Sequence, residues 1–136
     1  MIEETHREYP DIQLEHMLVD HGAFELVHAP DTFDVIVASN VFGDIIADEA
    51  AGLTGAGEFL PAGSLNAKRK GIYCPNQLHQ VYEELAGTGK ANPMGMVLAG
   101  AMMLTYSFGL EREGECVREA AYRVMEHGMN RRPWRS

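Results

Sequence analysis

The feature that most constrains this chain is an uncharged run, PMGMVLAGAMMLTYSFGL, at residues 93–110. The run is at the short end of what a bilayer requires and glycines interrupt it, so a buried helix is favoured over a membrane span. Asn92 and Pro93 suit the N-cap and the first position of that helix. A helix that is apolar on all sides fits the centre of a large protein or a subunit interface, and we expect Gly100 to allow a close helix contact. We therefore expect a neighbour to cover this helix, and we expect the chain not to be a monomer.

Composition limits the class of protein to which such a helix can belong. The chain has 136 residues, of which 46% are hydrophobic and 23% charged, which predicts a soluble globular protein of at most one ordinary domain. Its formal net charge of −9 argues against a nucleic-acid partner, because such proteins present a basic face. Only the tail, residues 130–136, is basic. Cys74 and Cys116 lack metal-ligand spacing and no secretory signal precedes them, so we expect a reduced, cytoplasmic protein with no membrane partner.

The order of the predicted elements indicates an α/β fold. Hydrophobic periodicity and helix stop signals predict, for the first part of the chain, a helix at 2–9, a strand at 14–20, a helix at 21–29, a strand at 33–39 and a helix at about 43–54. A glycine-rich stretch at 55–71, a short apolar run at 71–75 and an irregular segment to about 91 follow. The long apolar helix comes next, and the last predicted helix covers 114–128 and ends at Gly128. Strands that alternate with helices predict parallel strand pairing.

The predicted helix at about 43–54 holds two carboxylates on one stripe. Asp44 and Asp48 are four positions apart in NVFGDIIADEA, so they point the same way on a helix. Gly43 is expected to let the chain turn sharply from the preceding strand into this helix. Two like charges on one face reduce the stability of the helix unless a cation or a basic group neutralises them. From the residues alone, the pair is either a cation site or a solvated helix face with two unrelated acids.

The run FDVIVASNVFGDIIADEAAGLTGAGEFLPAGSLN, residues 33–66, resembles the signature of the β-decarboxylating dehydrogenases, which comprise isopropylmalate, isocitrate and tartrate dehydrogenases. The similarity extends back through EYPDIQLEHMLVD and forward through ELAGTGKANPMGMVLAGAMMLTYSFGL, and it is nearest to isopropylmalate dehydrogenase. It implies the C-terminal part of such an enzyme, with a partial isopropylmalate dehydrogenase-like α/β fold whose N-terminal half is missing. Residues 1–55 would belong to the family's smaller, dimer-forming domain, and residues 56–136 to its nucleotide-binding domain.

The resemblance also implies that a metal ion neutralises the paired aspartates. Asp44 and Asp48 match the aspartates of the family's Asn-x-Phe-Gly-Asp-x-x-x-Asp motif, and Asp20 matches a third carboxylate that the family supplies from the partner subunit of a dimer. The implied cofactor is Mg²⁺ or Mn²⁺, and the implied substrate is a 2-hydroxy acid with two or three carboxylates. Hard carboxylate oxygens suit Mg²⁺, which keeps few protein ligands. The ion would bind the substrate's hydroxyl and carboxylate and stabilise the enolate left when CO₂ departs.

The resemblance further implies NAD as a cofactor. His79 and Asn92 fall where the family contacts the adenosine moiety. Glu84 falls where the family has an aspartate that accepts from the ribose 2′-hydroxyl, and an acid there would repel the 2′-phosphate of NADP. The loop at 74–83 departs from the family pattern, because the Gly-Ser-Ala-Pro sequence is gone and Gln80 replaces the glycine that lets the backbone approach the cofactor.

The family's catalytic tyrosine, catalytic lysine and substrate-binding arginines lie upstream of residue 1 and have no match here. We therefore predict no catalytic residue in this chain. The resemblance implies a C-terminal portion of an NAD- and Mg²⁺-dependent oxidative decarboxylase that is inactive alone and works as a homodimer or with a complementing N-terminal chain. The alternative is a non-catalytic binding or interaction subunit that retains the dimerising fold.

Overall fold

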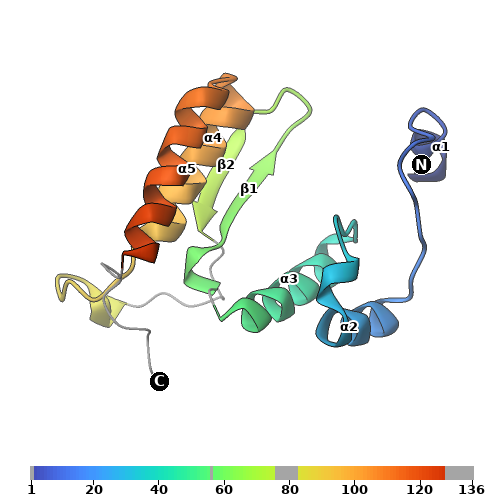
Figure 1. Cartoon of the computed structure of the whole chain (residues 1–136), viewed down its shortest axis with the longest axis horizontal. Helices are drawn as coiled ribbons and strands as arrows, with labels where there is room; N and C mark the ends of the chain where they lie inside the picture. Colours follow the sequence, from blue (N-terminus) through green and yellow to red (C-terminus); the bar gives the residue numbers. More distant parts are fainter. Residues whose placement is uncertain (1, 56, 76–82, 128–136) are drawn as a thin grey trace. The chain divides into compact units, whose positions relative to one another are not determined.

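The computed structural model describes residues 2–55, 57–75 and 83–127, which fall into two compact units (Figure 1). The first unit comprises Met1–Ala50 and the second comprises Ala51–Ser136. The boundary between these units follows Ala50, inside a helix, and the predicted division of the family's domains after residue 55 stays a prediction.

The first unit is helical. Its elements are α1 (Ile2–His6), α2 (Val19–His28), the 3₁₀ helix η1 (Pro30–Thr32) and most of α3 (Asn40–Thr54). The helices predicted at 2–9, 21–29 and 43–54 are thus present with shifted ends. Leu26 of α2 and Ile46 of α3 are the buried apolar side chains described in this unit. Its hydrophobic core is small, because most of its other large apolar side chains are exposed.

The strands predicted at 14–20 and 33–39 are wrong. Residues 13–18 and 35–39 have no regular secondary structure, and α2 already begins at Val19. The backbone next to these segments is extended, as at Phe33 (φ −100°, ψ 123°). An extended segment becomes a strand only when a neighbour pairs with its N–H and C=O groups, and no described segment pairs with these two. Val35 and Val37, expected in a buried strand, are 82% and 72% exposed.

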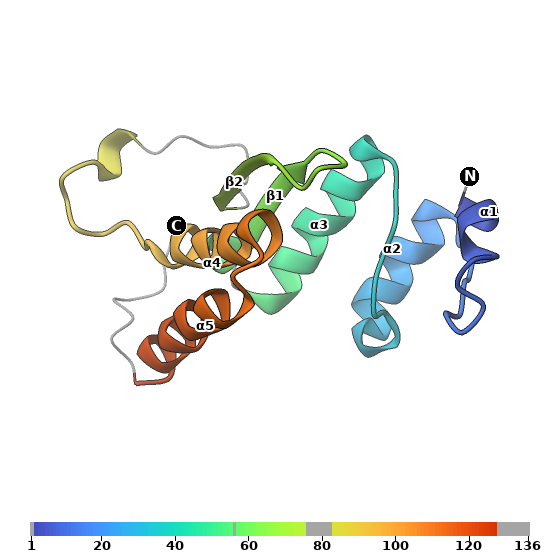
Figure 2. The same ribbon diagram turned by 90° about the horizontal axis from the view of Figure 1, so that it is seen from above.

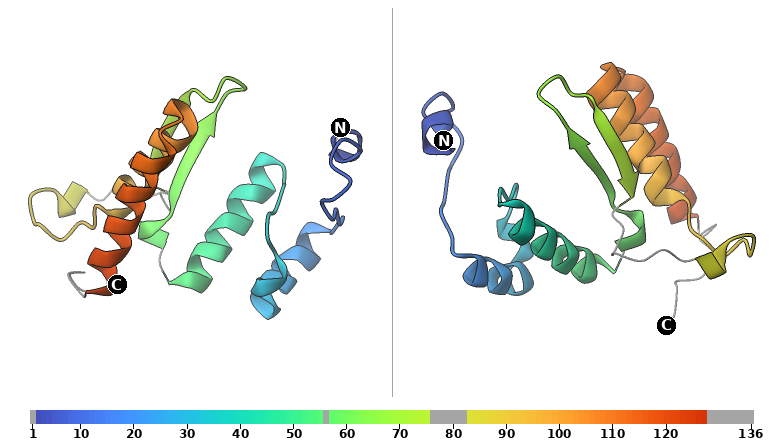
Figure 3. Two further views of the ribbon diagram at one scale, coloured as in Figure 1. Left: turned by 45° about the horizontal axis from the view of Figure 1, so that its top comes forward. Right: turned by 180° about the vertical axis from the view of Figure 1, so that it is seen from behind.

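The second unit consists of a β-hairpin and a helix pair. Its elements are the 3₁₀ helix η2 (Gly57–Phe59), β1 (Pro61–Leu65), β2 (Gly71–Pro75), the 3₁₀ helix η3 (Glu83–Leu85), α4 (Met94–Phe108) and α5 (Glu111–Glu126). The helix α4 contacts η2 and both strands, and α5 packs on α4 (Figure 3). The buried apolar side chains of this unit are Ala51, Leu98, Ala99, Ala101 and Ala121. The core therefore lies around α4.

The predicted parallel strand pairing is also wrong for the described residues, in which β1 and β2 pair antiparallel with Gly63 opposite Tyr73. A tight turn explains the direction, since parallel strands need a long crossover between them. The side-chain oxygen of Asn66 accepts hydrogen bonds from the backbone N–H groups of Lys68 (2.9 Å) and Lys70 (3.1 Å). Side-chain bonds of this kind stabilise turns, so the hairpin is a local consequence of the sequence around Asn66.

The long apolar helix is present as α4. The Asn92 side chain accepts from the N–H of Met94 at 3.0 Å, which is the N-cap bond expected with Pro93 at the first helical position. At the other end Gly109 is left-handed (φ 67°), and the N–H groups of Gly109 and Leu110 both donate to the carbonyl of Leu104, the latter at 2.9 Å, so a left-handed glycine ends the helix. No described helix has both the length and the apolar character needed to cross a membrane.

Within one chain the close contact between described helices lies at Gly114, and the contact expected at Gly100 with a neighbouring chain stays a prediction. A Cβ on Gly100 would meet no described atom within 4 Å, whereas a Cβ on Gly114 would clash with Thr105 Oγ1 and lie 2.9 Å from the carbonyl oxygen of Ala101. Because α5 begins at Glu111 rather than at residue 114, Gly114 lies in its first turn and faces α4. The predicted helix end at Gly128 and the basic tail lie outside the described residues.

Candidate metal and cofactor site

Asp44 and Asp48 lie on α3, as the sequence predicted. Asp44 is exposed and Asp48 is half-buried. The amide nitrogen Nδ2 of Asn40 donates to Oδ2 of Asp44 at 3.2 Å, so one oxygen of this carboxylate is held from the start of the helix. The helix begins at Asn40, and the N–H of Gly43 already donates to the carbonyl of Ser39 at 2.7 Å. Gly43 therefore lies in the first turn of α3. It does not form the sharp turn that was expected between a preceding strand and this helix.

The two aspartates share their helix face with apolar side chains. Val41 and Ile45 are large exposed apolar residues of α3, and their spacing places them on the same stripe as Asp44 and Asp48. Ile46, one position beyond Ile45, is buried instead. Carboxylates surrounded by exposed aliphatic groups form a surface that can both bind a hard cation and be covered by another polypeptide.

Asp20 lies in the first turn of α2 and not at the end of a strand, as the sequence had suggested. Its Oδ1 accepts a hydrogen bond from the N–H of His21 at 2.9 Å, and its side chain is exposed. Within the residues that the structure describes, no three His, Cys, Asp or Glu side chains are grouped closely enough to hold a metal ion. Asp20 of a given chain therefore does not join Asp44 and Asp48 of that chain.

The donor set of one chain fits a divalent ion only in part. Asp44 and Asp48 offer hard carboxylate oxygens on successive turns of one helix, which are ligands that suit Mg²⁺ or Mn²⁺. Two carboxylates leave most of an octahedral shell to other groups. Water, substrate or a ligand from another polypeptide would fill the remaining positions, and the expectation that Asp20 of a partner subunit provides one of them stays a prediction.

The predicted cofactor residues are distributed over a separate part of the chain. His79 lies outside the described residues. Glu84 is exposed in η3, and Asn92 is half-exposed before α4. The side-chain oxygen of Asn92 already accepts from the N–H of Met94, so this residue has a structural role in capping α4 whether or not it contacts a cofactor.

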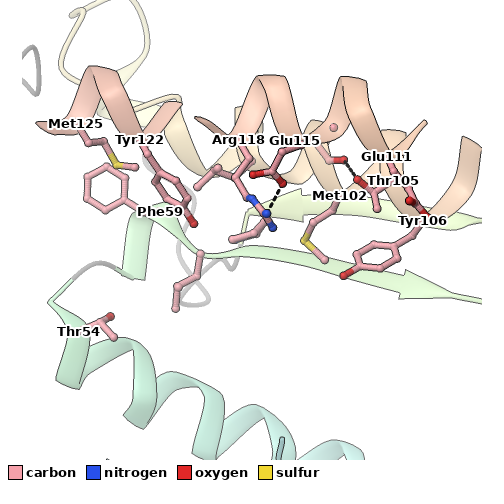
Figure 4. Close-up of a pocket in the computed structure, with 15 residues that line it drawn as sticks. Thr54, Phe59, Met102, Thr105, Tyr106, Glu111, Glu115, Arg118, Tyr122 and Met125 are labelled. Carbon is pink, nitrogen blue, oxygen red and sulfur yellow. Dashed lines mark hydrogen bonds and ion pairs between the residues drawn. The ribbon is translucent and has the colours of Figure 1, made fainter. Parts of the chain in front are cut away.

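A groove in the second unit was not predicted from the sequence. It has a volume of about 610 Å³ and lies between η2, the start of β1, α4 and α5 (Figure 4). Its apolar and aromatic walls include Phe59, Leu60, Met102, Tyr106, Tyr122 and Met125. Arg118 and Glu115, which form an ion pair along α5, also line it. The spacing of Glu111, Glu115, Arg118 and Tyr122 places these residues on one stripe of α5, which is a signal that could have located the groove.

Comparison with known proteins gives a consistent result. The sequence pattern of the isocitrate/isopropylmalate dehydrogenase family matches residues 1–132. The chain is 48% identical over 126 residues to 3-isopropylmalate dehydrogenase of Heyndrickxia coagulans, covering 93% of this chain and 34% of that protein. It is 44% identical over 130 residues to 3-isopropylmalate dehydrogenase of Bacillus subtilis (strain 168), covering 96% of this chain and 35% of that protein. The chain thus spans about a third of the length of these relatives.

Solved structures agree with the sequence comparison. The crystal structure of isocitrate dehydrogenase from Methylococcus capsulatus matches with a TM-score of 0.80 and 35% identity, covering 93% of this chain and 36% of that chain. The β-decarboxylating dehydrogenase of Thermococcus kodakarensis matches with a TM-score of 0.72 and 32% identity, covering 89% of this chain and 35% of that chain. The predicted partial isopropylmalate dehydrogenase-like fold is therefore confirmed, although the strands expected in the first unit are not formed.

Proposed function

Because the chain belongs to the isocitrate/isopropylmalate dehydrogenase family, we propose that it provides the C-terminal portion of an NAD- and Mg²⁺-dependent enzyme that oxidises and decarboxylates a 2-hydroxy acid. The observation that carries this proposal is the pair Asp44 and Asp48, which α3 presents on one face within the matched region. The relatives at 44–48% identity are 3-isopropylmalate dehydrogenases, so 3-isopropylmalate is the first substrate to test.

In this proposal the metal site forms between two chains. Asp44 and Asp48 of one copy provide oxygen ligands, and Asp20 of a second copy provides the third carboxylate. Asn40 holds one oxygen of Asp44 and leaves the other oxygen for the ion or for a bound water. A bound divalent ion supplies Lewis-acid stabilisation of the negative charge that develops on substrate oxygens. A homodimer formed by the first unit is also supported by the exposed apolar side chains beside the aspartates, Val41 and Ile45.

The second unit is proposed to bind the nicotinamide cofactor. Glu84 is exposed and can accept a hydrogen bond from a ribose 2′-hydroxyl, while its charge disfavours the 2′-phosphate of NADP. His79 and Asn92 are proposed to contact the adenosine moiety. Since the chain carries no match to the family's catalytic tyrosine, lysine and arginines, it is proposed to be inactive alone and to need a complementing polypeptide.

A non-catalytic interaction subunit is the second candidate. It is favoured by the large number of exposed apolar side chains in both units, including Phe24, Val35, Ile72 and Phe108. Contiguous exposed apolar surface is typical of a chain that binds another protein. This candidate predicts that the chain associates with a partner but that its aspartates have no specific affinity for a divalent ion.

Thermal unfolding with and without Mn²⁺ tests the proposed function. A ligand that binds only the native state at about ten times its Kd stabilises that state by about 1.4 kcal/mol, which corresponds to a rise in Tm of roughly 3–8 °C for a chain of this size. We expect millimolar affinity for the purified chain, because one chain supplies few ligands.

The variant Asp44→Asn with Asp48→Asn should lose the Mn²⁺-dependent rise in Tm. The matched control is Asp31→Asn with Asp34→Asn, which removes two exposed acids of the same unit and should retain the rise. A rise of equal size in wild type and in the Asp44/Asp48 variant would exclude these aspartates as the site and leave the interaction subunit as the better account.

A further inference from the structure

Asn40 begins α3 and shares a stripe of that helix with the two aspartates. Residues 40, 44 and 48 are separated by four positions each, and α3 is a continuous helix through them (Figure 2). Their side chains therefore follow one another at successive turns, about 6 Å apart along the helix axis. Asp44 is the middle residue of this row, with Asn40 on its N-terminal side and Asp48 on its C-terminal side.

The contact between Asn40 and Asp44 has a defined chemistry. The two side chains approach to 3.2 Å at Oδ2 of Asp44. A carboxylate only accepts hydrogen bonds, so the group of Asn40 that faces it must be the NH₂ and not the carbonyl. Among the described residues, none donates a hydrogen bond to Oδ1, the second oxygen of Asp44. The carboxylate is thus held through one oxygen and open at the other.

Asn40 holds this carboxylate without neutralising it. An amide donor is uncharged, whereas an arginine or a lysine at position 40 would compete with a metal cation for the same negative charge. The helix NVFGDIIADEAAGLT contains three carboxylates and no Lys, Arg or His. The helix itself therefore supplies no cation, and the negative charge of Asp44 stays available to a bound ion.

The number of oxygens that a carboxylate offers affects which cation it prefers. Ca²⁺ takes about six to eight oxygen ligands at roughly 2.3–2.6 Å and accepts carboxylates through one or both oxygens. Mg²⁺ requires near-octahedral coordination at about 2.0–2.1 Å. A carboxylate that is hydrogen-bonded through one oxygen can give only the other oxygen to an ion without losing that bond. Such a carboxylate suits a small octahedral ion and denies a larger ion a second ligand.

We propose that Asn40 is a positioning residue of the metal site, which holds Oδ2 of Asp44 so that this carboxylate presents Oδ1 alone, and which thereby favours Mg²⁺ and Mn²⁺ over Ca²⁺. The inference rests on the proposed function and deepens it, because it states which cations the aspartates select and which residue is responsible. Hydrogen-bonding partners of metal ligands orient those ligands, and their loss typically lowers metal affinity by about 10- to 100-fold.

The test measures the Kd of the full chain for both Mn²⁺ and Ca²⁺. The electron paramagnetic resonance signal of hydrated Mn²⁺ decreases when the ion binds, which gives the Kd for Mn²⁺, and competition by Ca²⁺ gives the Kd for Ca²⁺. Asn40→Ala removes the amide and should raise the Kd for Mn²⁺ about tenfold while changing the Kd for Ca²⁺ less than about threefold. The preference for Mn²⁺ should therefore fall by at least about threefold.

Asn40→Gln is the matched control. Glutamine keeps the amide donor and can pair with an aspartate four positions later in a helix, so this variant should retain the preference for Mn²⁺ within about twofold. Because both ions are measured on the same variant, a purely structural effect on the start of α3 would raise both dissociation constants alike and leave their ratio unchanged. An unchanged ratio in Asn40→Ala, or an equal loss of preference in Asn40→Ala and Asn40→Gln, would overturn the inference.

Failure of the proposed function gives a different result. In that case Mn²⁺ binding would be absent from the wild-type chain or would persist in Asp44→Asn with Asp48→Asn, and this inference would be overturned with it. Failure of the role of Asn40 alone would appear as an unchanged ratio in a chain whose Mn²⁺ binding still requires both aspartates.

Discussion

Gly114 determines how closely α4 and α5 approach. A Cβ at this position would clash with Thr105 Oγ1, and the carbonyl oxygen of Ala101 is also close, at 2.9 Å. Thr105 Oγ1 itself donates to that carbonyl at 3.1 Å, so the hydroxyl cannot move away without losing its hydrogen bond. The absence of a side chain at Gly114 is therefore a packing requirement.

The variant Gly114→Ala should destabilise the chain by about 1–3 kcal/mol, which is the usual cost of overfilling a packed contact. Gly100→Ala is the matched control, because a Cβ there meets no described atom within 4 Å and alanine favours the helix by roughly 0.5–1 kcal/mol. Urea denaturation measures both free energies of unfolding. Equal destabilisation by the two variants would contradict the assignment of the close contact to Gly114.

The aspartates show how far single residues could be predicted. The four-residue spacing of Asp44 and Asp48 was sufficient to place them on one helix face, because helical periodicity is local. Asp20 was expected at the end of a strand and lies in α2. Its location depends on whether residues 14–20 find a strand partner, which is a non-local property that the local pattern does not contain.

At the scale of elements, the hydroxyl groups of Tyr73 and Ser107 connect the hairpin to α4 through hydrogen bonds. Ser107 Oγ donates to the carbonyl of Arg69 in the hairpin turn. Because the serine hydroxyl has one hydrogen, it must accept in its other bond, and the Tyr73 hydroxyl donates to Ser107 Oγ at 2.9 Å. The ring of Tyr73 also lies over Gly63 of β1. These contacts hold both the turn and the centre of the hairpin on the helix.

Tyr73→Phe should lower the free energy of unfolding by about 0.5–1.5 kcal/mol, since it removes one hydrogen bond and keeps the ring. Ser107→Ala should cost more, because it removes the bond to the Arg69 carbonyl as well. The double variant should cost little more than Ser107→Ala alone, and a double-mutant cycle measures this coupling. Strictly additive effects would show that the two hydroxyl groups do not interact.

Helices and strands differed in how well the sequence predicted them. The long helix was located by its uncharged run and by the start signals Asn92 and Pro93, and the Asn92 cap acts through a bond within the same segment. The strands at 14–20 and 33–39 were predicted from β-branched residues, but a strand requires hydrogen bonds to another segment. The hairpin of β1 and β2 is present because Asn66 stabilises the turn that brings its two strands together.

At the scale of the whole molecule, large apolar side chains remain exposed in both units, among them Phe24, Val35, Ile72, Phe108 and Tyr122. Single exposed apolar residues are ordinary, but extended apolar surface is typical of association. We expect the purified chain to self-associate at micromolar concentration, with a two-fold dimer as the simplest assembly. Sedimentation equilibrium measures this, and a compact monomer at that concentration would contradict the expectation.

We propose that this chain contributes the metal-binding carboxylates of a family dehydrogenase but cannot catalyse the reaction alone. General acid–base groups each contribute on the order of a hundred- to ten-thousand-fold to the rate, and substrate positioning adds further. A chain that lacks all of the family's matching residues should therefore give no measurable turnover with 3-isopropylmalate, NAD⁺ and Mn²⁺. The missing groups should be restored when the unmatched part of a relative is supplied.

The most direct measurement follows the absorbance of reduced nicotinamide in three samples. These are the chain alone, the chain co-expressed with the unmatched part of the Bacillus subtilis relative, and that complex carrying Asp44→Asn and Asp48→Asn. We expect no turnover from the chain alone, turnover from the complex, and loss of turnover in the variant complex. Turnover by the chain alone at the roughly 10 per second of ordinary enzymes, or equal turnover by the variant and unaltered complexes, would contradict this expectation.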